Sequence, residues 1–232
     1  MQSTSNTYQS IISADGHWFE TKLLINGVTY DNTKLVSIST SHAMFSGTPV
    51  IGKAVAGEID AALLVPSADI PTMAELKPYV RVCNASSQSE WLPQGVYYID
   101  TRSETKNEHG ANVLTIHGFD AMLKTEQMFE SANITGDSVD TDMVDEIASI
   151  IGVTVDSRTY TIMTEAYTIP LPTGYTLREV LGYIASMYVG CFVMTDEGKL
   201  RLVSILELPA ETNYLIDELG NSITFGGDRI LV

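Results

Sequence analysis

The first half of the chain is patterned as a series of short strands. From residue 18 to residue 120, segments rich in aromatic and β-branched residues are separated by turn residues at short spacings. These segments are WFETKLLING, VTYDNTKLVSISTS, GEIDAALLVP, YVRVCNAS, GVYYIDTRSE and NVLTIHGFD. About six strands with such connections predict an antiparallel sandwich or barrel.

Two local signals refine this prediction. Asn26-Gly27 separates the first two segments and is the strongest short-range signal for a hairpin. Val36 and Ile38 then alternate with serines, which indicates a strand with one buried face. The segment DIPTMAELKPYV (69–80) contains two prolines and is expected to form a loop with a helical turn.

After residue 118 the apolar spacing becomes helical. FDAMLKTEQMF has near-helical spacing, and SVDTDMVDEIASIIGV predicts a helix with Met143, Ile147, Ile150 and Ile151 on one face. Gly152 suits the C-terminal stop of this helix. The acids in its first turns favour the positive end of the helix dipole. A calcium loop is the weaker alternative, because the D-x-D-x-D-G spacing and the late glutamate are missing.

The segment TGYTLREVLGYIASMYVG predicts a second helix. Thr176 and Glu179 form a capping-box signature, and Gly190 is expected to end the helix. One apolar stripe is predicted to be core, and it consists of Leu177, Val180, Leu181, Ile184, Ala185 and Tyr188. The following segment, CFVMTDEGKLRLVSI, predicts two strands around a tight turn at residues 196–198.

These patterns predict an α+β chain in three parts. Residues 1–126 form a β-domain whose first ten residues are a flexible arm, and residues 127–205 form an α+β domain of helices and a hairpin. Residues 206–232 begin a second β-domain, and the strand pattern that stops at Val232 suggests that the chain is cut short.

Composition narrows the possible functions. The chain has 13 basic and 29 acidic residues, a formal net charge of −16, so it offers few groups to neutralise phosphates and is not expected to bind nucleic acid specifically. Its apolar runs are strand-sized, and neither a membrane anchor nor a signal peptide is predicted. Cys83 and Cys191 are expected to be free thiols in packing roles.

Motifs of enzyme chemistry are missing from the sequence. The four histidines form no i,i+4 pair, and there is no G-x-S-x-G elbow, phosphate-binding loop or dinucleotide fingerprint. A Ser-His-Asp triad stays open, because triads assemble in space. The aspartates at strand ends, Asp60, Asp100 and Asp120, are expected to form turns. We therefore predict no catalytic residue, no metal and no cofactor.

Several long stretches resemble a known family. They are GEIDAALLVPSADIPTMAELKPYVRV, SEWLPQGVYYIDTRSETKN, LTIHGFDAMLKTEQ, IPLPTGYTLREVLGYIASMYVGCFVMTDEGKLRLV and ITFGGDRILV. From about residue 20 to the end, the chain resembles the N-terminal region of phage and prophage tail proteins of Gram-positive hosts, the baseplate hub or tail-tip proteins.

The resemblance implies a fold and an assembly. In that family a homo-trimeric hub contributes two tube-like β-domains per subunit to a ring that mates with the tail tube, and an α+β domain lies outside. A second tube-like domain would need far more than residues 206–232. The chain is therefore expected to be a fragment, or the remainder is expected to lie on another chain.

An aromatic segment supplies interface candidates. In SEWLPQGVYYIDTRSE, Trp91, Tyr97 and Tyr98 are the residues expected to contact neighbouring subunits, because aromatic rings with polar tips are enriched at interfaces. The alternative is that two of the three pack in the core. On a strand, Tyr97 and Tyr98 cannot both point inward, so at least one should reach a surface.

The resemblance and the missing motifs together predict a non-enzymatic structural protein of a phage tail. Its expected partners are tail tube, distal tail and tip or fibre proteins, in a virion assembled in the bacterial cytoplasm. DNA would pass at most through a channel whose acidic wall prevents adhesion. A cell-wall-active enzyme and a host-glycan-binding module are the alternatives.

Overall fold

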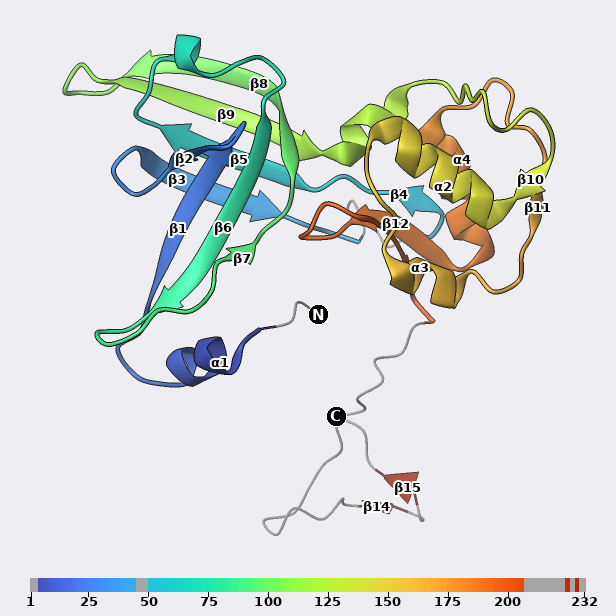
Figure 1. Cartoon of the computed structure of the whole chain (residues 1–232), viewed down its shortest axis with the longest axis horizontal. Coiled ribbons are helices and arrows are strands. Elements are labelled where there is room, and N and C mark those ends of the chain that lie inside the picture. Colours follow the sequence, from blue (N-terminus) through green and yellow to red (C-terminus); the bar gives the residue numbers. More distant parts are fainter. Residues whose placement is uncertain (1–3, 45–49, 207–223, 226–227, 230–232) are drawn as a thin grey trace.

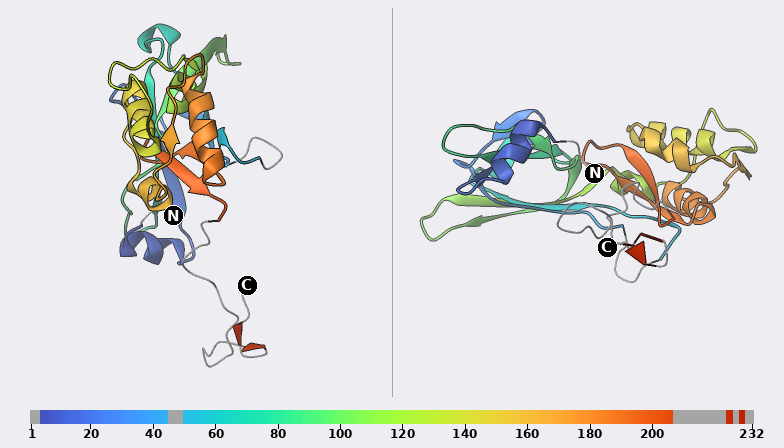
Figure 2. Two further views of the ribbon diagram at one scale, coloured as in Figure 1. Left: turned by 90° about the vertical axis from the view of Figure 1, so that its right-hand side faces the viewer. Right: turned by 90° about the horizontal axis from the view of Figure 1, so that it is seen from below.

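The computed structural model describes residues 4–44, 50–206, 224–225 and 228–229. These residues form two bodies that lie next to each other along the long axis of the molecule (Figure 1). The β body comprises residues 4–44 and 57–120, and the α+β body comprises residues 50–56 and 121–206. Seen from below, the two bodies again lie next to each other (Figure 2).

The β body is built around one large antiparallel sheet. Its elements are α1 (Asn6–Ile12), β1 (Trp18–Ile25), β2 (Val28–Tyr30), β3 (Leu35–Ser41), β5 (Glu58–Leu63), η1 (Ser67–Asp69), β6 (Glu75–Cys83), β7 (Leu92–Pro93), β8 (Tyr97–Lys106) and β9 (Asn112–Asp120). Strand order is β2-β1-β6-β8-β9-β5-β3, with β7 paired to β6. Among the described residues the sheet is open, with β2 and β3 at its edges, so the antiparallel prediction is confirmed and a closed barrel is not observed.

The α+β body combines helices with a small sheet. Its elements are β4 (Lys53–Ala54), η2 (Ala121–Glu126), β10 (Ser138–Val139), α2 (Asp140–Ile151), α3 (Ser157–Ile162), β11 (Thr168–Ile169), α4 (Leu177–Met187), β12 (Gly190–Met194) and β13 (Leu200–Ser204). The sheet has the order β13-β12-β4, and β10 pairs with β11. Helix α4 contacts β4 and β12, while α2 contacts α4.

The third predicted part falls mostly outside the described residues. Of residues 207–232, only the backbone ladder of β14 (Thr224–Phe225) and β15 (Asp228–Arg229) is described, and these two strands pair with each other. The predicted start of a second β-domain therefore stays a prediction.

The hairpin predicted at Asn26-Gly27 joins β1 to β2. Both turn residues have positive φ, 46° at Asn26 and 83° at Gly27, as a type I′ turn requires. Ile25 pairs with Val28 across the turn. The side-chain oxygen of Asn26 also accepts the backbone N–H of Glu75 at 2.9 Å, which ties the turn to β6.

The segment predicted as a loop with a helical turn forms part of a central strand instead. A short 3-10 turn is present at Ser67–Asp69, but Glu75–Cys83 is β6, between β1 and β8. Pro78 is tolerated because its carbonyl faces the β7 side, where it accepts the N–H of Gln94. On that side the partner of β6 changes from β8 to β7, since Leu76 pairs with Tyr97 and Tyr79 pairs with Pro93. Pro78 lies between these two pairs, so its missing N–H falls where the ladder is interrupted.

The N-terminal residues form a helix where a flexible arm was predicted. Ser5 is the N-cap of α1 and accepts the N–H of Tyr8 at 3.1 Å. The backbone N–H of Ser5 donates to a carboxylate oxygen of Glu90 at 2.7 Å, and Ile11 is buried. No local pattern predicts this helix, because its anchor, Glu90, lies far along the chain.

The two predicted helices of the α+β body are present. Gly152, with φ 76°, ends α2 in the left-handed conformation, and Thr176 and Glu179 form a complete capping box at α4. The predicted stripe of α4 is buried in the core of this body, which confirms its assignment. The prediction that Gly190 ends the helix is wrong, because α4 ends at Met187 and Gly190 begins β12. A Cβ on Gly190 would lie 2.5 Å from the carbonyl oxygen of Val203, so the neighbouring strand requires this glycine.

The chain passes between the two bodies more than once. Strand β4 comes from the first half of the sequence, yet it pairs in parallel with β12 in the second body. Directly before β4, the backbone lies close to α4, since a Cβ on Gly182 of α4 would lie 2.8 Å from the carbonyl oxygen of Gly52. Ala54 and Met122 belong to the core of the α+β body. Among the described residues, no helix is long and apolar enough to cross a bilayer.

Candidate interaction surface and interdomain junction

Tyr97 and Tyr98 begin β8 and point to opposite sides of the sheet. Tyr97 is completely buried in the core of the β body, where its hydroxyl bonds to His42 and donates to the carbonyl oxygen of Gln94 at 2.9 Å. Burial raises the pKa of Tyr97, and the charge of Asp120 adds to this effect. Tyr97 therefore packs in the core, whereas Tyr98 is half-buried and is the one of the two that reaches a surface.

Trp91 lies in a cation–aromatic patch on the outer face of β1 and β6. The ammonium of Lys22 is 4.3 Å from the centroid of the indole, and the guanidinium of Arg81 is 4.4 Å from it. Arg81 is held by Glu20, whose carboxylate oxygen is 2.6 Å from Nη2. Each cation–aromatic contact is worth about 0.5–1 kcal/mol at an exposed site. The patch presents a rigid ring flanked by positive charge, and we call it the Trp91 patch.

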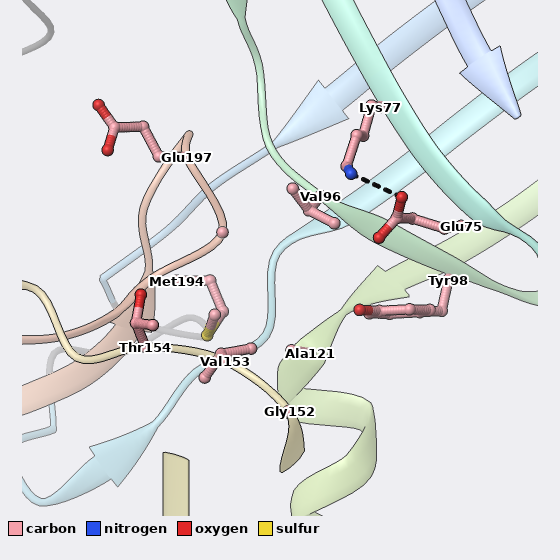
Figure 3. A pocket seen from close by; sticks show the side chains of 11 residues that line it. Glu75, Lys77, Val96, Tyr98, Ala121, Gly152, Val153, Thr154, Met194 and Glu197 are labelled. Atoms are coloured by element: carbon pink, nitrogen blue, oxygen red, sulfur yellow. Dashed lines mark ion pairs between the residues drawn. The ribbon is translucent and has the colours of Figure 1, made fainter. Parts of the chain in front are cut away.

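Tyr98 lines a cleft of about 370 Å³ between the two bodies. Figure 3 shows its ring together with the ion pair between Lys77 and Glu75, whose charged atoms are 2.6 Å apart. The ammonium of Lys124 lies 3.9 Å from the centroid of the Tyr98 ring. The opposite wall carries Thr154 and Glu197 of the α+β body. The cleft is polar and open, and its walls belong to different bodies.

Gly95 occupies a contact point between the bodies. Its φ of 113° favours glycine, and its N–H donates to the carbonyl oxygen of Asp196 in the β12–β13 turn at 3.0 Å. A Cβ on Gly198 in that turn would lie 2.8 Å from a methyl group of Val96. The loop at residues 94–96 therefore contacts the β12–β13 hairpin of the α+β body.

Asp120 lies where β9 crosses into the α+β body. Its side chain is the N-cap of η2 and accepts the N–H of Met122 at 2.9 Å and the N–H of Gly57 at 2.6 Å. The prediction of a turn-forming aspartate at a strand end holds for Asp120, but it is wrong for Asp60 and Asp100, which lie within β5 and β8. Gly57 allows this close approach, since a Cβ there would lie 2.9 Å from the imidazole of His42 and 3.0 Å from the carboxylate. Burial raises the pKa of Asp120 to about 6, and the two backbone N–H bonds oppose this shift.

The other titratable candidates in the described part of the chain lie at separate places. His17 and His109 are exposed, as predicted, and His117 bonds to the carboxylate of Asp60 at 2.9 Å on the sheet surface. In the part of the chain that the structure describes, no three His, Cys, Asp or Glu side chains form a potential metal site. Cys83 and Cys191 are free and buried, as predicted.

Sequence reasoning missed the Asp120, Gly57 and His42 cluster. These residues lie far apart in the sequence, and the sheet brings them together through the pairing of β5 with both β3 and β9. Gly57, which lies between two strand segments, was the one signal in the sequence for this cluster, because an interior glycine can mark the close approach of another chain segment.

Comparison with known proteins supports a likeness in fold. No protein-family model matches the chain, and no curated protein matches its sequence. The structure is similar to the 43 kDa tail protein of prophage MuSo2 from Shewanella oneidensis, with a TM-score of 0.53 and 16% identity, over 80% of this chain and 53% of that one. It is also similar to a tail protein from Neisseria meningitidis MC58, with a TM-score of 0.55 and 11% identity, over 83% of this chain and 53% of the other.

These similarities define the class of fold. At such low identities they establish that the chain shares the fold of two phage-type tail proteins. The chain spans about half the length of each of them. Neither body alone makes up 80% of the chain, so the shared architecture includes parts of both bodies.

Proposed function

We propose that the protein is a structural, non-enzymatic component of a phage tail or a related tail-like particle. The observation that carries this proposal is the fold shared with two tail proteins over at least 80% of the chain. The finer part of the proposal rests on the stretches of sequence that resemble hub and tail-tip proteins. The place within the tail that we propose is the baseplate hub or tail tip of a phage with a Gram-positive host.

We propose that the protein works by assembly, as a homo-trimer that contacts tail tube, distal tail and tip or fibre proteins. The open sheet supports this proposal, because edge strands pair readily with other chains. Strand β3 carries no charged residue and no proline over Leu35–Ser41, so it lacks two common devices that block such pairing. The Trp91 patch and Tyr98 are the surfaces proposed to contact neighbouring subunits or tail proteins.

The direct test is to locate the chain in purified particles. Gold-labelled antibodies against it should mark the tail end of particles induced from the host strain, under negative-stain electron microscopy. Label on the capsid, or particles without label, would contradict the proposal. Release of peptidoglycan fragments by the purified chain would support the enzyme alternative, and a saturable glycan titration by calorimetry would support the binding-module alternative.

A second test addresses assembly through β3. Ser37 and Ser39 are exposed on this edge strand, and lysines there should block pairing with another chain. The double variant Ser37→Lys/Ser39→Lys should be a monomer by light scattering under conditions where the parent chain forms larger species. Ser103→Lys is the matched control, because Ser103 is exposed on β8, which lies inside the sheet.

A further inference from the structure

The junction between the bodies is centred on a buried carboxylate. Asp120 is 1% exposed. Its two carboxylate oxygens accept backbone N–H groups from two different segments that connect the bodies. Gly57 lies on the crossing from β4 to β5, and Met122 follows the crossing from β9 to η2. The backbone N–H of Asp120 donates in return to the carbonyl oxygen of Gly57 at 3.0 Å. One side chain thus ties together two of the segments that connect the bodies.

Asp120 also faces a cavity of about 130 Å³. The imidazole of His42 and the apolar side chains of Val55, Val193 and Met194 line this cavity. Residues of both bodies form its walls, so a change in their relative position would change its size. A cavity of this volume can admit water, but its lining is mostly apolar. Asp120 is therefore solvated poorly while the junction is closed.

The ionisable groups around Asp120 come from several elements. His42 approaches from the end of β3, the buried hydroxyl of Tyr97 from β8, and the guanidinium of Arg178 from α4. Arg178 lies along η2, where it donates to the carbonyl oxygen of Met122 at 2.9 Å and pairs with Glu126 at the end of the turn, and its charge lowers the pKa of Asp120 without a direct bond to the carboxylate. Backbone N–H groups are thus the direct partners that the structure gives to the Asp120 carboxylate.

We propose that this junction is a proton-controlled joint, in which a proton on Asp120 favours the closed arrangement seen here and its loss favours an arrangement that exposes Asp120 to water. The reason is electrostatic, because burying an ionised carboxylate is costly and burying its neutral form is much less so. Opening would hydrate the charge and would expose the apolar side chains, such as Val193 and Met194 of the α+β body, that line the cavity.

The size of the effect follows from linkage between protonation and opening. The pKa of Asp120 is raised from its ordinary value of 3.8 to about 6 in the closed arrangement. The closed form therefore binds the proton more tightly, so closure is favoured at low pH and that advantage is lost as the pH rises through about 6. Between about pH 4 and pH 6 the ratio of closed to open molecules falls by roughly 100-fold.

The test measures the distance between the bodies as a function of pH. Thr105 in β8 and Asp142 in α2 are both exposed, and nitroxide labels on cysteines at these positions report that distance by pulsed electron paramagnetic resonance. The native cysteines are buried and should stay unlabelled. We expect one narrow distance at pH 4 and a second population that grows between about pH 4 and pH 6, where the ratio of closed to open molecules changes most. A single distance that does not change between pH 4 and pH 7 overturns the proposal.

Two further measurements assign the response to Asp120. Asp120→Asn should abolish the pH dependence, whereas Asp60→Asn, which removes an exposed carboxylate on β5, should leave it intact. In the unsubstituted protein, the carboxyl carbon of Asp120 and the amide of Gly57 should titrate together near pH 6 by nuclear magnetic resonance. A response that persists in Asp120→Asn, or a carboxyl midpoint near 4, overturns the proposal. The titration needs no variant, so it decides the question even if Asp120→Asn does not fold.

Discussion

The two bodies of this protein are stabilised by contacts of different range. In the β body the core side chains of β1, β5, β6 and β9 meet through strand pairing between distant parts of the sequence. In the α+β body, α2 and α4 are defined by local features, such as the left-handed Gly152 and the capping box of Thr176. Yet the α+β body also takes β4 from the first half of the chain.

The α+β body does not form independently of the β body, even though local features define its helices. Its sheet is completed by β4, and η2 contributes Ala121 and Met122 to its core. Both segments are continuous with strands of the large sheet. We therefore expect the two bodies to fold and unfold together, although their helices and strands are specified in different ways.

Matched core substitutions test this expectation and should have the largest effect. Leu181→Ala in α4 and Leu114→Ala in β9 each remove a completely buried side chain, and each should lower the free energy of unfolding by about 2–5 kcal/mol. Urea denaturation, followed by tryptophan fluorescence and far-ultraviolet circular dichroism, should show one shared transition for both variants. Two separate transitions, with only one shifted in each variant, would show that the bodies are independent. A Leu181→Ala melting temperature that hardly moves would mean that the α4 stripe is not core.

A second prediction compares two of the buried aspartates, Asp120 and Asp156. Asp156 caps α3, and its carboxylate accepts Nε and Nη2 of Arg158 at 2.8 and 2.7 Å. These bonds hold the pKa of Asp156 well below its usual range, whereas burial raises that of Asp120. Asp156→Ala should lower the free energy of unfolding by about 2 kcal/mol at pH 7.

The sign of the pH dependence separates the two aspartates. A lowered pKa means that Asp156 stabilises the fold above its ordinary pKa of 3.8 and loses this contribution as the pH falls below it. The difference between Asp156→Ala and the parent chain in urea denaturation should therefore shrink from about pH 4 downward. A difference that stays constant down to pH 2.5 would contradict the assignment. Asp142→Ala is the control, because this aspartate is exposed in α2.

The next prediction concerns the close contact that seats β4 on α4. Gly182→Ala should gain helix propensity, but the added Cβ would meet the Gly52 carbonyl oxygen at 2.8 Å and force the segments apart. A net loss of about 1–2 kcal/mol in the free energy of unfolding is expected. Ser149→Ala, at an exposed position of α2, is the control and should be neutral or slightly stabilising. Stabilisation by Gly182→Ala would show that β4 can move away from α4 at little cost.

The same contrast in range explains how much the sequence could predict. The capping box and the Asn26-Gly27 hairpin depend on neighbouring residues, and both were predicted correctly. The segment YVRV was predicted as a strand, but the first half of β6 was missed because Pro78 is tolerated only where the partners of the strand change. Trp91, Tyr97 and Tyr98 were candidates because aromatic rings are enriched at interfaces, and strand alternation indicated only that one of the two tyrosines reaches a surface. No local pattern brings Asp120 to Gly57, since that contact depends on the register of the whole sheet.

The smallest expected effect on stability belongs to the Trp91 patch, where the question is binding. Trp91→Ala removes contacts with Lys22 and Arg81 and should cost about 1 kcal/mol or less, because these groups lie at the surface. If the patch contacts other tail proteins, the same substitution should weaken co-assembly with them by more than tenfold in a binding titration, as expected for a central aromatic contact. Trp18→Ala is the matched control, because Trp18 is more exposed on the same strand pair and belongs to no cation–aromatic contact recorded among the described residues. Equal losses of binding in both variants would indicate a general apolar contact, whereas no loss in Trp91→Ala would leave Lys22 and Arg81 as groups that only stabilise the sheet.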